Sequence, residues 1–296
     1  MRLLITGREG QLARCLAEIG AADRSLTVQT LARPELDLGR IETIRPAIRS
    51  AAPDVILNAA AYTAVDQAED EPEIAFRVNA EAAGELAAAA REAGAPIIHI
   101  STDYVFDGRG EGPYPETAAT NPLGVYGRSK LAGEREVAAA NPDHLIVRTA
   151  WVYSPFGRNF VKTMLNLARE RDRLSVVDDQ WGNPSSALDL AEGLLSILRR
   201  WRDRPGHGFG EIYHLAGSGS TSWCRFAAAI LDCSSRLGGP TAEVQPIATR
   251  DWPTKAPRPA NSRLDCSKFA GDFGYVAPEW TLSTAETVRR LVAGVG

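Results

Sequence analysis

Cysteine and histidine are scarce in this sequence, with four of each among 296 residues. Neither type recurs at the short spacings that hold a metal ion, so the residues predict no metal site. A chain of this length can bury most of its apolar surface without covalent cross-links. We therefore expect buried or incidental thiols at Cys15, Cys224, Cys233 and Cys266.

An excess of charge of one sign is also missing. The formal net charge is −4 and the signs are scattered, so no basic surface is predicted for a nucleic acid or an anionic membrane. No apolar run approaches the length of a membrane span. The apolar stretch 1–5 leads directly into Thr6-Gly7 and is too short for a signal peptide. We expect a cytoplasmic protein that binds neither nucleic acid nor membrane.

Short apolar runs alternate with longer amphipathic ones through the first half of the chain. The pattern predicts strands at 3–5, 27–31, 55–57, 97–101 and 145–149, and helices at 11–20, 41–51 and 72–93. Regular alternation of this kind favours a parallel sheet with right-handed crossovers. The predicted fold class is therefore α/β, with a doubly wound parallel sheet.

Beyond Trp151 the alternation loosens. Helices are predicted at 159–171, 188–201 and 222–230, and strands at 174–177 and 212–215. The stretch 246–261 holds four prolines and is expected to be an ordered surface loop that carries function. We predict a first domain at residues 1–150, to which later segments return, and a smaller second domain made mainly of residues 151–296.

A glycine-rich turn, Gly7-Arg8-Glu9-Gly10-Gln11-Leu12, follows the first predicted strand and opens the first predicted helix. Glycines allow a tight turn with little side chain in the way, and the helix N-terminus adds partial positive charge, so the turn suits a pyrophosphate. Such turns are common, and a plain turn is the alternative. Its place after the leading strand favours a dinucleotide site at Gly7, Gly10, Gln11 and Leu12.

The end of the second strand indicates which dinucleotide is bound. A site selective for NAD usually has an acid there, whereas an arginine accommodates a 2′-phosphate. Ala32 stands in the place of the acid and Arg33 follows it. We predict NADPH as the preferred cofactor. NADH use, and Arg33 as a plain surface residue, stay open.

Two further segments are expected against the cofactor. Asp37-Leu38 lies where a carboxylate can accept a hydrogen bond from the adenine amino group. Ala60-Ala61-Tyr62-Thr63 follows the third strand, and its small residues let the backbone lie against the cofactor. An alanine-rich strand end packed under a helix is the alternative for this second segment.

Tyr126 and Lys130 are four residues apart in a predicted helix, so their side chains share one face. A free tyrosine has a pKa of about 10 and is a useful acid only if that pKa is tuned. A neighbouring ammonium favours the phenolate, so we expect Lys130 to lower the pKa of Tyr126. The same lysine can hydrogen-bond the nicotinamide ribose. Taken alone, the pair also fits two surface residues.

Thr102 follows the fourth predicted strand, where the residues of a doubly wound sheet line the ligand crevice. Its hydroxyl would lie near Tyr126 and could stabilise negative charge on a substrate carbonyl. The alternative is that Thr102 and Asp103 cap a turn. The joint order of glycine-rich turn, hydroxyl residue and Tyr-x-x-x-Lys favours the catalytic interpretation.

The chain resembles the dTDP-4-dehydrorhamnose reductases of the extended short-chain dehydrogenase/reductase superfamily. The resemblance covers nearly the whole chain, and its most specific segments are 101–108 (Ser-Thr-Asp-Tyr-Val-Phe-Asp-Gly) and 179–184 (Asp-Gln-Trp-Gly-Asn-Pro). The other matching segments are 7–12, 58–66, 122–134, 148–153, 159–164, 258–259 and 261–262.

The resemblance implies a Rossmann-type NAD(P)-binding domain and a smaller C-terminal substrate-binding domain. It also implies reduction of the 4-keto group of dTDP-4-dehydro-L-rhamnose, a dTDP-linked 4-keto-6-deoxyhexose, by NADPH to give dTDP-L-rhamnose. Carried over by position, Thr102, Tyr126 and Lys130 form the catalytic set.

The resemblance also suggests substrate contacts. Asp103, Tyr104 and Trp151 match positions expected near the sugar. The candidates for the diphosphate and nucleotide, where a cationic fork suits the charge, are Asn159, Lys255 and Arg258.

The chain departs from its relatives at a metal site. Some relatives hold magnesium at a dimer interface through glutamates, but Cys15 and Leu188 occupy such positions here. No metal is therefore carried over, and the chain is expected to be a monomer or a homodimer.

Two rival functions stay open. One is another nucleotide-sugar reductase, epimerase or dehydratase of the superfamily, for which Asp103 supplies the carboxylate that a dehydratase wants after Thr102. The other is a non-catalytic, NADP-binding regulatory module, which the retention of Thr102, Tyr126 and Lys130 argues against.

Overall fold

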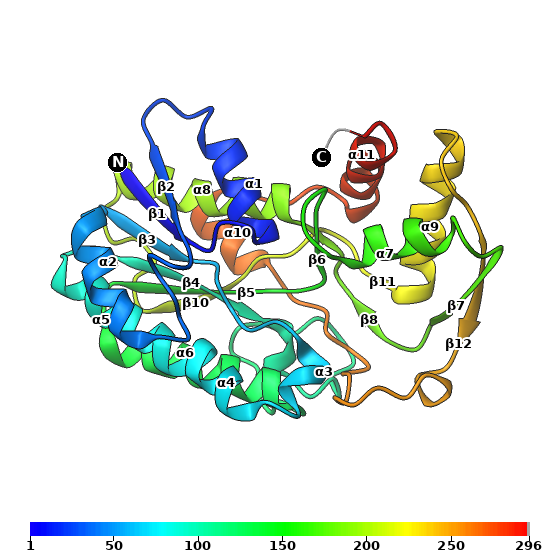
Figure 1. Cartoon of the computed structure of the whole chain (residues 1–296), viewed down its shortest axis with the longest axis horizontal. Helices are drawn as coiled ribbons and strands as arrows, with labels where there is room; N and C mark the ends of the chain where they lie inside the picture. The colour runs from blue at the N-terminus through cyan, green and yellow to red at the C-terminus, as the bar shows by residue number, and fades with distance from the viewer. Residues whose placement is uncertain (295–296) are drawn as a thin grey trace.

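A parallel sheet of six strands forms the centre of the computed structural model, which describes residues 1–294 (Figure 1). The strand order is β10-β5-β4-β3-β1-β2, and each neighbouring pair is parallel. The strands are β1 (Arg2–Thr6), β2 (Thr27–Leu31), β3 (Val55–Asn58), β4 (Ile97–Thr102), β5 (His144–Thr149) and β10 (Glu211–His214). Every residue of β3 and β5 is buried, as expected for strands covered on both faces. The predicted doubly wound sheet is confirmed.

Helices cover the two faces of this sheet and form a separate apolar core on each (Figure 1). One face carries α1 (Gln11–Gly20), α8 (Ala187–Asp203) and α10 (Ser267–Phe273). The other carries α2 (Ile44–Ala51), α5 (Ala82–Glu92) and α6 (Val125–Ala140). In α1, the buried Leu12 and Leu16 recur at the spacing that places them on one face of a helix.

A smaller unit lies at the right of Figure 1 and has its own apolar core. It is built from α7 (Phe160–Leu167), α9 (Trp223–Arg236) and α11 (Trp280–Val292), with a parallel pair formed by β7 (Arg173–Val177) and β12 (Glu243–Ile247). Two short strand pairs link it to the sheet: β6 (Val152–Tyr153) with β9 (Ser185–Ser186), and β8 (Trp181–Gly182) with β11 (Thr221–Ser222). Since α8, β10 and α10 return to the large sheet, the two units interleave along the chain.

Several boundaries differ from the prediction. The helix expected at 72–93 is divided into α4 (Pro72–Phe76), a π-helical turn (Arg77–Glu81) and α5, while the helix expected at 159–171 ends at Leu167. The loop expected from Pro246 begins later, because Pro246 lies in β12, whose partner is β7. Proline is tolerated there since β12 is an edge strand of a two-stranded pair. Among residues 1–294, no helix is both long and apolar enough to cross a membrane.

Candidate active site

The glycine-rich turn lies at the point where the sheet changes winding direction. β1 and β3 are neighbours in the sheet, α1 after β1 covers one face and α5 after β3 covers the other. In open α/β sheets, ligands bind in the crevice at such a point. Gly7 has a φ of 87°, a conformation that glycine adopts without strain, and a Cβ placed on it would lie 3.6 Å from the Cβ of Ala60. The structure therefore brings these two predicted cofactor residues together.

The N-terminus of α1 is open to an anion. Its N-cap is Gly10, which has no side chain to hydrogen-bond the first backbone N–H groups. These groups and the helix dipole make a site for a phosphate. Gln11 reaches the other unit: its Oε1 accepts hydrogen bonds from Ser154 Oγ and Asn159 Nδ2, both at 2.9 Å. Leu12 is buried in the core beneath the turn.

The adenine end of the crevice holds the other predicted cofactor residues. Arg33 is exposed just after β2, Leu38 is buried, and the Asp37 carboxylate accepts the Gly39 N–H at 2.9 Å. Sequence reasoning missed Arg8, whose guanidinium lies 3.8 Å from Glu35 beside the same turn. Its position between Gly7 and Gly10 in the glycine-rich turn could have pointed to a contact with the cofactor.

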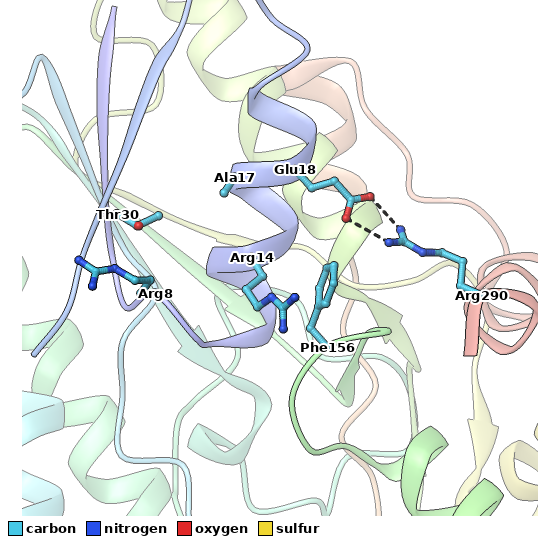
Figure 2. A pocket seen from close by; sticks show the side chains of 7 residues that line it. All are labelled: Arg8, Arg14, Ala17, Glu18, Thr30, Phe156 and Arg290. Carbon is cyan, nitrogen blue, oxygen red and sulfur yellow. Dashed lines mark hydrogen bonds and ion pairs between the residues drawn. The ribbon is translucent and has the colours of Figure 1, made fainter. Parts of the chain in front are cut away.

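Arg8 also lines an open cavity of about 490 Å³ on the outer side of α1 (Figure 2). The lining residues are Arg8, Arg14, Ala17, Glu18, Thr30, Phe156 and Arg290. Arg14 stacks on the Phe156 ring at 3.9 Å, while Arg290 donates two hydrogen bonds to Glu18. The cavity holds none of the predicted catalytic residues. It extends from the end of β2, where Arg8 and Thr30 lie, to the loop at Phe156.

Helix α6 positions Tyr126 and Lys130. Its N-terminus is capped by Glu69, which accepts the Val125 N–H at 2.7 Å. Within the helix, Gly127 lies so close to the Tyr104 carbonyl oxygen that a Cβ would overlap it. Gly133 approaches the backbone of Asn79 in the π-helical turn equally closely. The helix is therefore held against two backbone segments at once.

Asn79 connects this turn to the cofactor segment. Its Oδ1 accepts the Tyr62 N–H at 2.8 Å, and its Nδ2 donates to Ser129 Oγ at 2.9 Å. Ser129 in turn donates to the Tyr126 carbonyl. The Tyr62 hydroxyl donates to Glu71 at 2.7 Å. The conformation of 60–63, with Ala61 half-buried and Thr63 exposed, is thus tied to the helix that carries Tyr126.

Thr102 ends β4, and it lies close enough to Tyr126 to lower the pKa of the phenol. The Thr102 hydroxyl also donates to Asp103 Oδ1 at 2.9 Å and accepts the Tyr104 N–H at 3.2 Å. Thr102 therefore both caps a turn and adjoins the phenol, and its catalytic role stays a prediction. Burial raises the pKa of Asp103 to about 7, against opposing hydrogen bonds from Thr102 and Ser262. Strongly shifted groups of this kind gather at functional sites.

The expectation that the pKa of Tyr126 is lowered by Lys130 is wrong. Burial raises the pKa of Tyr126 to about 12, and the neighbouring Thr102 hydroxyl partly offsets this. The Lys130 ammonium is also buried, and it donates a hydrogen bond to the Ile100 carbonyl at 2.6 Å. Burial lowers the pKa of Lys130 to about 8, against the influence of Glu134. Desolvation, which the sequence does not display, outweighs the charge of the neighbour.

Two of the predicted sugar-contacting residues pack against other aromatic rings. The rings of Tyr104 and Tyr126 meet edge to face with centroids 5.6 Å apart. Trp151 has a φ of 46° and stacks on Trp223 at 3.5 Å, and its indole N–H donates to Ser262 at 3.1 Å. Left-handed backbone at a bulky residue costs energy and is typical of functional positions.

The predicted nucleotide-contacting residues are divided between two places. Arg258 lies 5.9 Å from the Tyr104 ring and donates to Asp66 at 2.7 Å, and Lys255 forms an ion pair with Asp70. Asn159 lies elsewhere, where it caps α7 and contacts Gln11. The structure thus brings Arg258 near Tyr104 and Asn159 to the glycine-rich turn.

Two buried polar atoms of residues beside Tyr104 have no hydrogen-bond partner within residues 1–294: Asp103 Oδ2 and Arg258 Nη1. An unpaired buried polar group is costly, so a ligand that satisfies both atoms would be favoured. In the same described range, no three His, Cys, Asp or Glu side chains are grouped as metal ligands. Cys15 is fully buried, and all four cysteines are free.

Comparison with known proteins identifies the family. The family described as RmlD substrate binding domain matches residues 1–293. The chain belongs to this family. The dTDP-4-dehydrorhamnose reductase of Sinorhizobium fredii is 48% identical to it, over 99% of this chain and 97% of that protein. The resemblance inferred from the motifs is confirmed.

Solved structures of the family agree with the fold. A dTDP-4-dehydrorhamnose reductase from Clostridium acetobutylicum has a TM-score of 0.90 at 38% identity, covering 98% of this chain and 99% of that chain. One from Bacillus anthracis, solved in complex with NADP, has a TM-score of 0.90 at 33% identity with the same coverage.

The contact between Gly127 and Tyr104 predicts a loss of stability in Gly127→Ala. The added methyl group would meet a backbone oxygen that cannot rotate away, so α6 has to shift. We expect the free energy of unfolding to fall by about 1–3 kcal/mol, as for other overpacked sites. Chemical denaturation measures it.

Gly271→Ala is the matched control, since Gly271 lies within α10 and a Cβ there meets nothing within 4 Å. Alanine in a helix interior is favoured by roughly 0.5–1 kcal/mol. A Gly127→Ala protein as stable as Gly271→Ala would contradict the close contact.

Proposed function

We propose that the chain reduces the 4-keto group of dTDP-4-dehydro-L-rhamnose with NADPH and forms dTDP-L-rhamnose. The observation that carries this proposal is the position of Tyr126: its phenol lies beside Thr102 at the carboxyl end of β4, on a helix locked to the cofactor segment. The match to reductases of this activity over nearly the whole chain supports the same conclusion.

The residues present fit the cofactor. The uncapped N-terminus of α1 and the close approach of Gly7 to Ala60 leave backbone N–H groups for a pyrophosphate. Arg33, with Arg8 beside the same turn, would bind the 2′-phosphate. Asp37 and Leu38 would contact the adenine. Bound NADPH supplies the hydride that reduces the ketone.

The catalytic residues manage the proton and the developing charge. Tyr126 donates its phenolic proton to the carbonyl oxygen, a role for which a pKa of about 12 keeps it protonated at neutral pH. Thr102 hydrogen-bonds the same oxygen once its hydroxyl turns from Asp103. Lys130 would bind the nicotinamide ribose.

The substrate would lie against Tyr104, Trp151 and the loop after β12, which carries Lys255 and Arg258. The unpaired Asp103 Oδ2 suits a sugar hydroxyl, and the unpaired Arg258 Nη1 suits an oxygen of the diphosphate. Asn159 would approach the diphosphate from the side of Gln11. Residues 1–150 with the returning segments form the cofactor domain in this proposal, and residues 151–296 mainly form the substrate domain.

The substrate is tested by NADPH oxidation with dTDP-4-dehydro-L-rhamnose beside GDP- and UDP-linked keto-sugars. Stoichiometric NADPH consumption with the dTDP-linked sugar is expected. Turnover of that sugar without net NADPH consumption would instead indicate an epimerase or dehydratase. Tight NADPH binding with no turnover of any sugar would indicate a regulatory module.

Tyr126→Phe tests the proton donor. Removal of a general acid costs about two to four orders of magnitude in kcat, and we expect a loss of this size. The Kd of NADPH, measured by fluorescence titration, should change little because the ring is retained. Nearly normal turnover would mean that the proton comes from another group.

Arg33→Ala tests the choice of cofactor. Loss of the guanidinium should raise the KM for NADPH about 10-fold or more, as for other hydrogen bonds to a charged group, and leave the KM for NADH nearly unchanged. Arg24→Ala is the control. Arg24 is also an exposed arginine, but it precedes β2, whereas Arg33 follows the strand. An equal effect of Arg33→Ala on both cofactors would overturn the role of Arg33.

A further inference from the structure

A chain of buried polar side chains crosses the sheet beneath the proposed active site. Thr6 on β1, Asn58 on β3, His99 on β4 and Lys130 on α6 are each at most 2% exposed. Thr6 Oγ1 and Asn58 Oδ1 are 2.6 Å apart, Asn58 Nδ2 and His99 Nδ1 are 3.0 Å apart, and His99 Nε2 and Lys130 Nζ are 3.4 Å apart. The mechanism above uses only the last of these residues.

The direction of the Thr6–Asn58 hydrogen bond determines the donor in the other two bonds. Thr6 Oγ1 accepts the Ala60 N–H at 3.1 Å and donates its own proton to Asn58 Oδ1. A distance of 2.6 Å is usual for O–H···O and short for N–H···O, which supports an oxygen of the Asn58 amide at this position. The amide nitrogen then faces His99 and donates to Nδ1. A neutral imidazole that accepts at Nδ1 carries its proton on Nε2.

This proton points at Lys130. An ammonium has three donors and no acceptor, so it gains nothing from a second N–H group, whereas an uncharged amine has a lone pair that accepts one. We infer that His99 is a positioning residue for Lys130, and that its Nε2–H, fixed by Asn58 and Thr6, favours the uncharged amine over the ammonium. The Ile100 carbonyl accepts from Nζ in either state and holds the amine in place.

The charges around the pair agree with this arrangement. Burial, then Lys130 and His144, hold the pKa of His99 well below its usual range, so the imidazole is neutral. Burial lowers the pKa of Lys130 to about 8, and Glu134 on the same helix opposes this. Glu134 is itself neutralised by Arg148 on β5, which donates two hydrogen bonds at 2.9 and 2.7 Å, and it accepts a third bond from Ser101.

A lysine held in this way is a better acid toward Tyr126, and this use of it rests on the proposed function. After the phenol has given its proton to the sugar oxygen, the phenolate needs a new one. An N–H bond of the Lys130 ammonium breaks and the O–H bond of Tyr126 forms, downhill from a pKa of about 8 to one of about 12. The amine left behind accepts the Nε2–H of His99. Solvent then returns a proton to Lys130.

The tautomer of His99 is the direct test. The full chain is labelled with ¹⁵N-histidine, and long-range ¹H–¹⁵N NMR distinguishes a protonated Nε2 from a protonated Nδ1. We expect the Nε2–H form of His99. The Nδ1–H form would overturn the inference. Since no substrate is needed, this result is independent of the proposed function.

His99→Gln tests the consequence in the holoenzyme. A glutamine amide can present its oxygen to Lys130, which stabilises the ammonium. The alkaline limb of the pH profile of kcat/KM should then move up by about one unit. His214→Gln is the control, because His214 is equally buried, lies on β10 and hydrogen-bonds the Tyr114 carbonyl instead. If the alkaline limbs of the kcat/KM profiles of His99→Gln and His214→Gln coincide, the role of His99 is overturned. If His99→Gln does not fold, the tautomer decides.

Discussion

The direct backbone contact of α6 with two other segments is the constraint on which the site depends. Gly127 touches the Tyr104 carbonyl and Gly133 touches the Asn79 carbonyl, and neither position has room for a Cβ. Side chains can change rotamer to absorb a strain, but packed backbone moves only as a whole. Backbone packing therefore fixes where the helix places Tyr126 and Lys130 relative to β4.

The same close packing removes water from the titratable groups. Desolvation is the largest cause of the raised pKa of Asp103, the raised pKa of Tyr126 and the lowered pKa of Lys130. In each case the charged form is disfavoured, and with pKa values of about 7 and about 8 Asp103 and Lys130 titrate close to neutral pH. Negative charge that develops on a ketone oxygen is weakly screened in such surroundings, and hydrogen bonds from Thr102 and Tyr126 act on it strongly.

Local pattern was sufficient for the cofactor half of the fold. The helix at 11–20 and the strand at 27–31 were predicted to the residue, because apolar periodicity and flanking turns define them without reference to the rest of the chain. The glycine-rich turn and Tyr126 were recognised because their spacing is short.

Features that depend on tertiary burial could not be predicted in this way. The pKa of Tyr126 is raised where a lowered value was expected. The sequence shows that Lys130 is near, but it does not show that both side chains are buried away from solvent. His99 looked like one of four scattered histidines, and only the pairing of β1, β3 and β4 aligns it with Asn58 and Lys130. The loop that carries Arg258 was expected to have a function. Its ion pair with Asp66 could not be predicted, because Asp66 is 192 residues away in sequence.

Side chains join the cofactor crevice to the smaller unit at two places. Gln11 accepts hydrogen bonds from Ser154 and Asn159, and Asp66 accepts hydrogen bonds from Arg258 and the Ala256 N–H. A typical hydrogen bond contributes about 1 kcal/mol net, so these links can rearrange at a cost that ligand contacts readily offset. Asp66 engages Nη2 of Arg258 and leaves Nη1 unpaired, so the guanidinium is oriented before an anion reaches it. Orientation in advance lowers the entropy cost of binding, so under the proposed function Asp66 would aid recognition of an anion by Arg258 instead of competing with it.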